Sequence, residues 1–487
     1  MSDDNQMRGR QERSFYFEEA LLPNGWSKGV RVQVSREGVI IGVQESSLPL
    51  AGDIKVSEPS CPGVSNLHSH SFQRAIAGRT ATRQKNSQDH FWTWRDAMYR
   101  AALRLSPEDL SAIAAQCFLE MIERGYTSVA EFHYLHRDVK GERYEVLSEL
   151  SQAVINAALS VGLPITHLPV LYRWSGVGAQ PLREDQRRFE LSLDEYSQMI
   201  SELDSLYHDV PTVQVGIAPH SLRAVSPEEL ELIADPSFCP SLHGKDRPLH
   251  IHISEQQAEV NMWLELTGQR PVEWLLNCHE LNSRWCLVHA THINEKETTR
   301  LARTGAIAGL CPSTEADLGD GIFPLVDFLN QGGQYGIGSD SNLRIDLSEE
   351  LRLLEWGQRL KHEQRNLALS RSVEGRISSH DQKPNPYESL GQSMLLASAQ
   401  GGGRATQRET GFKIGAHADW FTLNNQDMGL VNSSGYLHTD QWLFASRDSR
   451  VKDVFINGQR VLSDGYHPLR TQINQSFVEA IKRLYQS

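Results

Sequence analysis

The sequence has few cysteines and no long apolar run. Its 487 residues include 6 cysteines, none of them in a Cys-x-x-Cys pair. Disulfide frameworks and structural zinc sites need denser or paired cysteines, so these thiols are expected to be free, as in a cytoplasmic protein. No segment reaches the roughly eighteen apolar residues of a membrane-spanning helix, and residues 1–14 contain no apolar signal core. We therefore expect neither secretion nor insertion into a membrane.

An excess of basic residues is also absent. Lysine and arginine number 48 against 61 aspartates and glutamates, which gives a net charge of -13 and a pI near 5.8. No repeat of fixed period is visible, so a repeat architecture is not expected. The charge balance argues against nucleic acid or an anionic membrane surface as the main partner.

Strand-like and helix-like patterns divide the chain into four segments. Residues 1–58 and 405–470 contain short alternating strands, 59–404 alternate strand-like runs with longer helical patterns, and 471–487 has helical spacing. The middle segment predicts an α/β fold, a TIM-like (β/α)8 barrel, and the terminal segments a small β-sandwich domain beside it. A doubly wound open sheet is the alternative. The eight strand-like runs cover residues 63–67, 127–132, 165–171, 213–217, 249–253, 285–288, 306–310 and 335–338.

Capping residues mark the boundaries of one βα unit. Ser106 is suited to be an N-cap, Pro107 occupies the first helical position, and Gly125 provides a stop before the strand at 127–132. Two longer loop-like tracts lie at 174–188 and 370–385. The first is expected to be either a lid over an active site or a plain surface insertion.

A His-x-His pair follows the first strand-like run. His68 and His70 are two residues apart, so on a strand their imidazoles point to the same face and can bind one metal ion. Two polar residues at a strand end are the ordinary alternative. The metal interpretation therefore depends on finding further ligands.

Later strand ends carry candidates for those ligands. The fifth run contains His250 and His252 and is followed by Glu255, and the sixth is followed by His289 and His292. A histidine ligand with a nearby carboxylate is how metal hydrolases pair a Lewis acid with a proton carrier. Within each histidine pair, the sequence alone does not say which residue would act.

An aspartate completes the candidate set. Asp340 follows the eighth run, where a carboxylate at a barrel mouth is costly unless a cation is near, although it could also be an N-cap. Histidines and an aspartate at these strand ends form N and O donors that suit Zn²⁺ or Fe²⁺. Three histidines and one carboxylate leave room for a water whose pKa the metal lowers to about 7. The implied chemistry is hydrolysis.

This order of residues resembles the amidohydrolase superfamily over about residues 16–465. Its mononuclear deaminases place His-x-His, His, His and Asp on strands one, five, six and eight, and no lysine for a second metal ends the fourth run here. The resemblance favours His252 and His289 over their neighbours. It implies one divalent metal, Zn²⁺ with Fe²⁺ as the alternative, on the ligands His68, His70, His252 and Asp340, and the catalytic residues Glu255, His289 and Asp340.

Longer motifs resemble the formimidoylglutamate deiminases of histidine degradation, which hydrolyse N-formimino-L-glutamate to N-formyl-L-glutamate and ammonia. A substrate with two carboxylates requires bidentate donors, and Arg95 and Arg223 are the candidates. The resemblance adds Gln73, Tyr134 and His220 as polar substrate contacts and implies a homodimer. The motifs lie at 68–75, 91–95, 131–136, 218–223 and 338–342, with further matches at 178–181 and 186–189.

These residues imply a mechanism and two rival functions. His289 and Asp340 would accept the proton of the attacking water, while Glu255 would protonate the imine nitrogen. The nearest rival is another deaminase of the superfamily, acting on guanine or an adenosine derivative in a pocket with more aromatic and amide groups. The other rival is a non-catalytic scaffold, but such relatives usually lose ligands and none is missing here.

Overall fold

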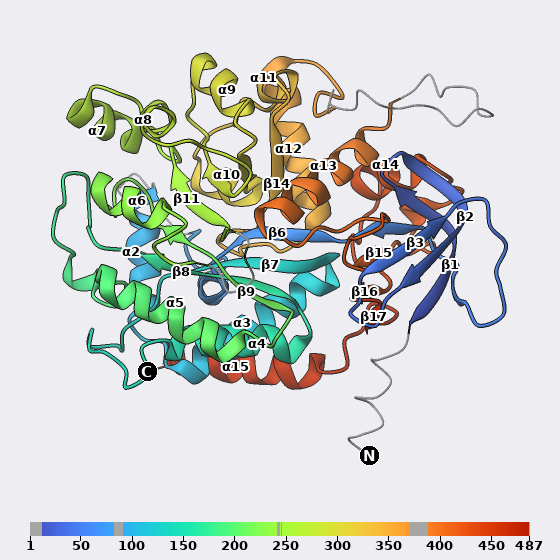
Figure 1. Cartoon of the computed structure of the whole chain (residues 1–487), viewed down its shortest axis with the longest axis horizontal. Coiled ribbons are helices and arrows are strands. Elements are labelled where there is room, and N and C mark those ends of the chain that lie inside the picture. Colours follow the sequence, from blue (N-terminus) through green and yellow to red (C-terminus); the bar gives the residue numbers. More distant parts are fainter. Residues whose placement is uncertain (1–11, 82–90, 241–243, 245, 370–387, 487) are drawn as a thin grey trace.

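A computed structural model describes residues 12–81, 91–240, 244, 246–369 and 388–486 (Figure 1). Most of the chain forms a barrel surrounded by helices. A β domain built from both ends of the chain lies beside this barrel. The loop expected at 370–385 lies outside the described residues.

The middle of the chain forms a closed barrel of parallel strands. One sheet holds five strands, β6 to β10, and another holds four, β11 to β14. Two parallel bridges, Ile217 with Leu249 and Ser69 with Asp340, join the sheets into a ring. β9 and β10 both pair with β8, so these two short strands together form the fourth strand of the barrel. The predicted (β/α)8 barrel is therefore confirmed, and the alternative of a doubly wound open sheet is wrong. The strands are β6 (Val64–Ser69), β7 (Tyr126–His133), β8 (Ile165–Leu171), β9 (Val213–Val215), β10 (Ala218–Pro219), β11 (Leu249–Ile253), β12 (Trp285–His289), β13 (Ile307–Leu310) and β14 (Gln334–Ile337).

Helices surround the barrel (Figure 1). The apolar side chains of strands and helices form one large buried core between the two layers. The helices are α2 (Phe91–Ala102), α3 (Pro107–Glu123), α4 (Glu149–Val161), α5 (Leu193–Tyr207), α6 (Pro227–Ala234), α7 (Gln257–Thr267), α8 (Pro271–Cys278), α9 (Glu295–Ala302), α10 (Pro312–Leu318), α11 (Leu325–Asn330), α12 (Leu347–His362), α13 (Leu390–Ala405), α14 (Leu437–Phe444) and α15 (Arg470–Gln486).

The two ends of the chain meet in an 8-stranded sheet, in the order β17-β16-β15-β5-β1-β2-β3 with β4 beside β1. Phe15 of β1 packs edge-on against Trp420 of β15, with ring centroids 4.8 Å apart, so both terminal segments share one core. The small β domain is thus built from the two termini as predicted. Its strands are β1 (Arg13–Leu22), β2 (Gly25–Val34), β3 (Ile40–Gln44), β4 (Ile54–Val56), β5 (Ser60–Pro62), β15 (Trp420–Thr422), β16 (Val454–Ile456) and β17 (Gln459–Leu462).

Short-range signals explain several element boundaries. The Ser106 hydroxyl accepts a hydrogen bond from the Asp109 N–H at 3.1 Å and caps α3. Asn457 and Gly458 both have positive φ, 50° and 69°, as a tight hairpin between β16 and β17 requires. These predictions from local sequence are confirmed.

The end of the barrel opposite the strand carboxyl ends is closed by α13. A Cβ on Gly401 would lie 1.9 Å from the carbonyl oxygen of Tyr335, so only glycine allows this helix to contact β14 directly. Ala405 at the end of α13 accepts a hydrogen bond from His250 Nε2 at 2.8 Å. The barrel is therefore plugged at this end, and its opening lies at the other.

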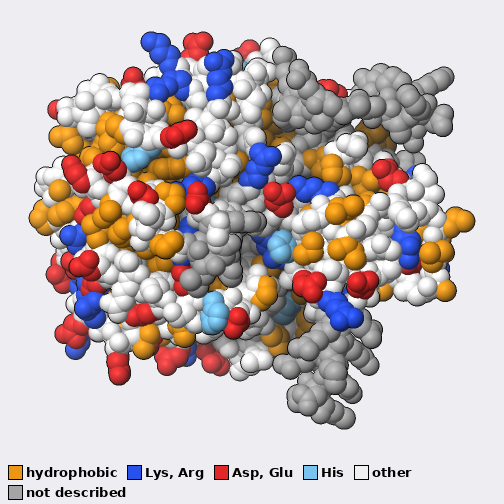
Figure 2. Space-filling model, in the orientation of Figure 1, with side chains coloured by type: hydrophobic (Ala, Val, Ile, Leu, Met, Phe, Trp, Pro, Cys, Tyr) orange, Lys and Arg blue, Asp and Glu red, His pale blue; other side chains and the backbone are white. Residues whose placement is uncertain are grey.

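The surface is mixed in charge. Lysine and arginine side chains are scattered among acidic ones over the described part of the face drawn in Figure 2. In the part of the chain that the structure describes, no helix combines the length and the apolar character needed to cross a membrane. All six cysteines are free.

Candidate active site

Every ligand and catalytic residue predicted from the sequence lies near the carboxyl end of a barrel strand. His68 is near the end of β6, His252 is on β11, and Asp340 follows β14. Parallel strands in a barrel bring their carboxyl ends to one rim. Side chains that are 184 or more residues apart in the sequence therefore come into contact.

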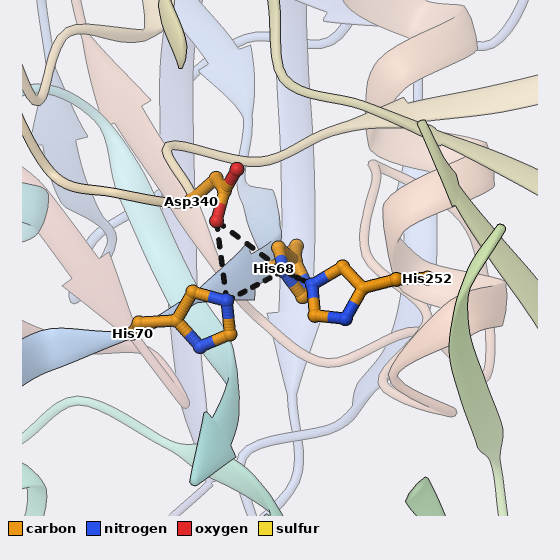
Figure 3. A group of neighbouring side chains, drawn as sticks. All are labelled: His68, His70, His252 and Asp340. Atoms are coloured by element: carbon orange, nitrogen blue, oxygen red, sulfur yellow. Dashed lines mark hydrogen bonds and ion pairs between the residues drawn. The ribbon is translucent and has the colours of Figure 1, made fainter. Parts of the chain in front are cut away.

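Three imidazoles and one carboxylate converge on a single point (Figure 3). His68 Nε2 lies 3.2 Å from His70 Nε2 and 3.0 Å from His252 Nε2. The Asp340 Oδ1 atom lies 3.2 Å from His70 Nε2 and 3.5 Å from His68 Nε2. Four donors bonded to one tetrahedral zinc ion at about 2.1 Å would be separated by roughly 3.4 Å. The donor spacing therefore fits such an ion.

Hydrogen bonds on the outer ring nitrogens also favour a cation. His70 Nδ1 lies 2.7 Å from the Phe132 carbonyl oxygen, and His252 Nδ1 lies 3.0 Å from the His220 carbonyl oxygen. A ring nitrogen beside a carbonyl must carry the proton, so Nε2 of each neutral ring presents a lone pair to the centre. His68 can donate to only one of these lone pairs. A metal ion would satisfy all of them.

A buried polar network holds β6 and the end of β14 together. Asn66 Nδ2 donates to the Ser339 hydroxyl at 2.6 Å, and that hydroxyl donates to Asn342 Oδ1 at 2.6 Å. Gly338 lets this segment approach, because a Cβ there would lie 2.8 Å from His68 Cβ. The network thus fixes Asp340 against the His-x-His pair.

The backbone is strained at several of the strand ends that carry the polar residues of the site. Ser254, His289 and Asp340 have φ values of 51°, 66° and 44°, in the left-handed region that such residues rarely adopt. Strain of this kind is concentrated at functional sites, where surrounding contacts enforce it. Here it directs the His289 and Asp340 side chains into the barrel mouth.

Glu255, His289 and Asp340 form a second, overlapping group. His289 Nε2 lies 3.7 Å from Glu255 Oε1 and 3.6 Å from Asp340 Oδ2. Burial, with the charges of Asp340 and Glu259, raises the pKa of Glu255 to about 7 despite His289 and Arg223. A carboxyl group with this pKa can both donate and accept a proton at neutral pH.

The protonation of the other two groups follows from their neighbours. Burial alone would lower the pKa of His289, but the carboxylates of Glu255, Glu315 and Asp340 raise it to about 10. Burial would raise the pKa of Asp340, but the neighbouring imidazoles of His68 and His70 hold that pKa well below its usual range. Asp340 is therefore ionised, the state in which a carboxylate can bind a metal ion.

Two acidic residues of this group were missed by the sequence analysis. The Glu315 Oε1 atom on α10 lies 3.4 Å from His289 Nδ1, and Asp320 is grouped with Glu255 and His289. Burial and the nearby carboxylate of Glu255 raise the pKa of Asp320 to about 9. The position of Glu315 just after the seventh barrel strand was a signal that could have found it.

The predicted substrate residues line one pocket above this centre. The Gln73 amide nitrogen donates to the Tyr134 hydroxyl oxygen at 2.7 Å. His220 is buried, which holds its pKa well below the usual range and keeps the ring neutral. Arg95 and Arg223 face the same pocket, and the buried Nε of Arg223 has no hydrogen-bond partner among the described residues.

The geometry distinguishes the two histidines within each pair that the sequence left open. His252 faces the donor centre, whereas His250 faces α13 at the plugged end of the barrel. His289 contacts three carboxylates of the site. His292 is half-buried and belongs to none of the groups that could hold a metal in the described chain.

The end of the 174–188 tract packs behind two residues of the pocket wall. Gln186 and Arg188 are fully buried, and Gln186 hydrogen-bonds two pocket tyrosines, Tyr99 and Tyr172, that the sequence analysis did not single out. A plain surface insertion would leave such residues exposed. This end of the tract therefore acts as fixed structure around the pocket.

Comparisons with known proteins agree with the fold. A model described as "Amidohydrolase family" matches residues 60–461. A formimidoylglutamate deiminase of Pseudomonas aeruginosa is 41% identical over 472 residues, 97% of this chain and 99% of that protein. A 5-methylthioadenosine/S-adenosylhomocysteine deaminase of Natronomonas pharaonis is 26% identical over 65% of this chain and 66% of its own. The crystal structure of an amidohydrolase from Brucella melitensis superposes with a TM-score of 0.87 at 38% identity, over 97% and 99% of the two chains.

Proposed function

Since this chain belongs to the amidohydrolase family, we propose that it hydrolyses N-formimino-L-glutamate to N-formyl-L-glutamate and ammonia in histidine degradation. The observation that carries the substrate assignment is the pair of arginines in the pocket above the donor centre. The buried Nε of Arg223 has no hydrogen-bond partner among the described residues, and a carboxylate of the substrate would supply one. The relative from Pseudomonas aeruginosa supports the same assignment.

We assign one divalent metal to the group of His68, His70, His252 and Asp340. Zn²⁺ suits three imidazoles and a carboxylate best, and Fe²⁺ is the alternative. An ion bound there would supply a nucleophile from water at neutral pH, because it would lower the water pKa toward about 7. No lysine follows β10, where His220 stands, which agrees with a single ion.

The chain's own groups handle the protons. Glu255 donates its proton to the terminal imine nitrogen as water adds to the formimino carbon. Once reprotonated, it donates a second proton to the same nitrogen, which leaves as ammonia while the hydroxyl of the adduct gives up its proton to form the formyl carbonyl. Each proton that the water gives up passes first to the Asp340 carboxylate. His289, whose ring its neighbours keep protonated, can then give its Nε2 proton to Glu255 and take the one held by Asp340, because Nε2 lies within 3.7 Å of both carboxylates. The nitrogen of the glutamate part needs no proton and stays bound to the formyl carbon.

The decisive assay is ammonia release from N-formimino-L-glutamate, measured beside guanine and S-adenosylhomocysteine. We expect turnover of the first substrate alone, its loss after treatment with a chelator, and its return when Zn²⁺ is added. Turnover of one of the heterocycles without turnover of N-formimino-L-glutamate would overturn the proposal and favour the rival deaminase. No turnover of any substrate by the metal-loaded protein would favour the scaffold.

Arg223→Met and Arg95→Met test the substrate class. Each removes a bidentate carboxylate donor, so KM for N-formimino-L-glutamate should rise about a hundredfold while the bound metal stays unchanged. Kinetics and metal analysis of both variants provide the measurement. Arg173→Met is the matched control, because Arg173 pairs with Glu229 outside the pocket lining. An unchanged KM in both pocket variants would contradict a dicarboxylate substrate.

A cytoplasmic location and a homodimer complete the proposal. The six free cysteines support a reducing compartment. The homodimer is implied by the family resemblance and stays a prediction, which the mass of the particle in solution would test.

A further inference from the structure

Two tyrosine hydroxyls lie beside the arginines of the pocket. Tyr99 is on α2 and Tyr172 directly follows β8, and their exposed fractions are 2% and 1%. The Arg95 guanidinium lies 5.4 Å from the centre of the Tyr99 ring. Arg223 lines the same pocket as both tyrosines. The two hydroxyls therefore belong to the same region of the pocket as the two guanidinium groups.

Gln186 determines which way these hydroxyls point. Its Oε1 atom accepts a hydrogen bond from the Arg183 N–H at 3.0 Å, which identifies the other end of the amide as nitrogen. That nitrogen lies 3.2 Å from the Tyr99 hydroxyl oxygen and 3.0 Å from the Tyr172 hydroxyl oxygen. An amide nitrogen only donates, so both hydroxyl oxygens accept from Gln186 and both O–H protons point elsewhere.

At least one of those protons is left for a ligand. Tyr99 and Tyr172 are within hydrogen-bonding reach of each other, so one hydroxyl can donate to the other. The second proton cannot be used in the same way, because one bond between two hydroxyls consumes a single proton. The remaining O–H belongs to a pair that lines the pocket.

An aromatic contact holds the arrangement rigid. The fully buried ring of Phe189 lies 5.2 Å from the Tyr99 ring, 5.4 Å from the Tyr172 ring and 5.1 Å from the Tyr134 ring, measured between centroids. Tyr172 also packs on His220 at 4.4 Å. Groups fixed in this way lose little entropy when a ligand binds.

We infer that the hydroxyl pair of Tyr99 and Tyr172 donates a hydrogen bond to a carboxylate of the substrate and that Gln186 is the positioning residue that directs the pair. The inference rests on the proposed function for the identity of the substrate, but the ligand chemistry comes from the site. Two guanidinium groups beside an outward O–H donor match a carboxylate, which only accepts hydrogen bonds. A neutral heterocycle would bring no negative charge to the buried guanidinium of Arg223.

The test combines isosteric variants with two measurements. Tyr99→Phe and Tyr172→Phe each remove one hydroxyl, and Tyr126→Phe, in a buried tyrosine outside the pocket lining, is the matched control. KM for N-formimino-L-glutamate should rise about tenfold in each pocket variant and about a hundredfold in the double variant, with kcat within about threefold. The Kd of the product N-formyl-L-glutamate, measured by calorimetry, should weaken in parallel and does not depend on turnover.

Gln186→Glu tests the direction of the hydrogen bonds. The new carboxylate can still accept from the Arg183 N–H, but it turns both tyrosine O–H groups toward itself and away from the ligand. KM should rise more than in either single tyrosine variant. If the effect acts through the hydroxyls, the same substitution in the Tyr99→Phe/Tyr172→Phe background should raise KM less than it does in the wild type.

The possible failures are distinguishable. Turnover of N-formimino-L-glutamate with unchanged KM and Kd in the double tyrosine variant would overturn the inference and leave the proposed function standing. Absence of turnover in the wild type, with product binding that weakens in the tyrosine variants, would overturn the proposed function and support the carboxylate site. A wild type that neither turns over this substrate nor binds the product would overturn both.

Discussion

Replacing Asp340 with asparagine should lower kcat at least about a thousandfold while the protein stays folded. The two side chains have the same shape, so the strained backbone and the contact with β6 can be kept. The amide lacks the negative charge that His68 and His70 now stabilise from 3.5 and 3.2 Å. It therefore weakens the cation site and removes one proton acceptor in a single step.

The measurements are kcat, metal content and far-UV circular dichroism. Asp317→Asn on the exposed side of α10 is the matched control, and its activity should equal that of the wild type. Near-normal turnover by the Asp340 variant would refute the site. Loss of the native circular dichroism spectrum would instead require His252→Ala as the second variant, for which we expect the same loss of turnover in a folded protein.

Replacing Glu255 with glutamine should lower kcat about 10²–10⁴-fold and leave the bound metal in place. Glu255 is outside the four-donor group, so its loss removes proton transfer without removing a ligand. Glu265→Gln, on the exposed side of α7, is the control. A large loss of metal in the Glu255 variant would show that this residue acts as a ligand instead.

The pH profile of the wild type gives an independent check on Glu255. Burial raises the pKa of Glu255 to about 7, so the carboxyl group loses its proton as the pH rises through that value. A step that needs the protonated acid should therefore give a kcat/KM that falls above about pH 7. The residual activity of Glu255→Gln should not show this fall above about pH 7. If both proteins show the same fall, the titrating group is not Glu255.

Local patterns in the sequence were sufficient for much of the fold. The cap at Ser106 and the turn at Asn457 and Gly458 depend on hydrogen bonds and φ values within a few residues, and both are present. The alternation of strand-like and helical runs predicted the barrel because parallel strands need a crossover between them. The fourth strand is the exception, since Gly216 interrupts it where a Cβ would lie 2.5 Å from a side-chain atom of Leu168.

The sequence by itself determined which chemical groups stand at the strand ends. Residues two apart on a strand share a face, so their spacing alone is enough to pair His68 with His70. The choice between His250 and His252 could not be made that way, because both face the inside of the barrel. Their functions differ only because one lies at the open end and the other meets α13.

Tertiary structure alone decided which distant groups act together. Closure of the barrel brings His68, His252 and Asp340 within bonding distance of one ion, and it places Glu315 against His289. The direction of the Tyr99 and Tyr172 hydroxyls likewise depends on Gln186, 14 residues beyond Tyr172 and 87 beyond Tyr99. Contacts of this kind are set by packing between elements, and no periodicity within one element encodes them.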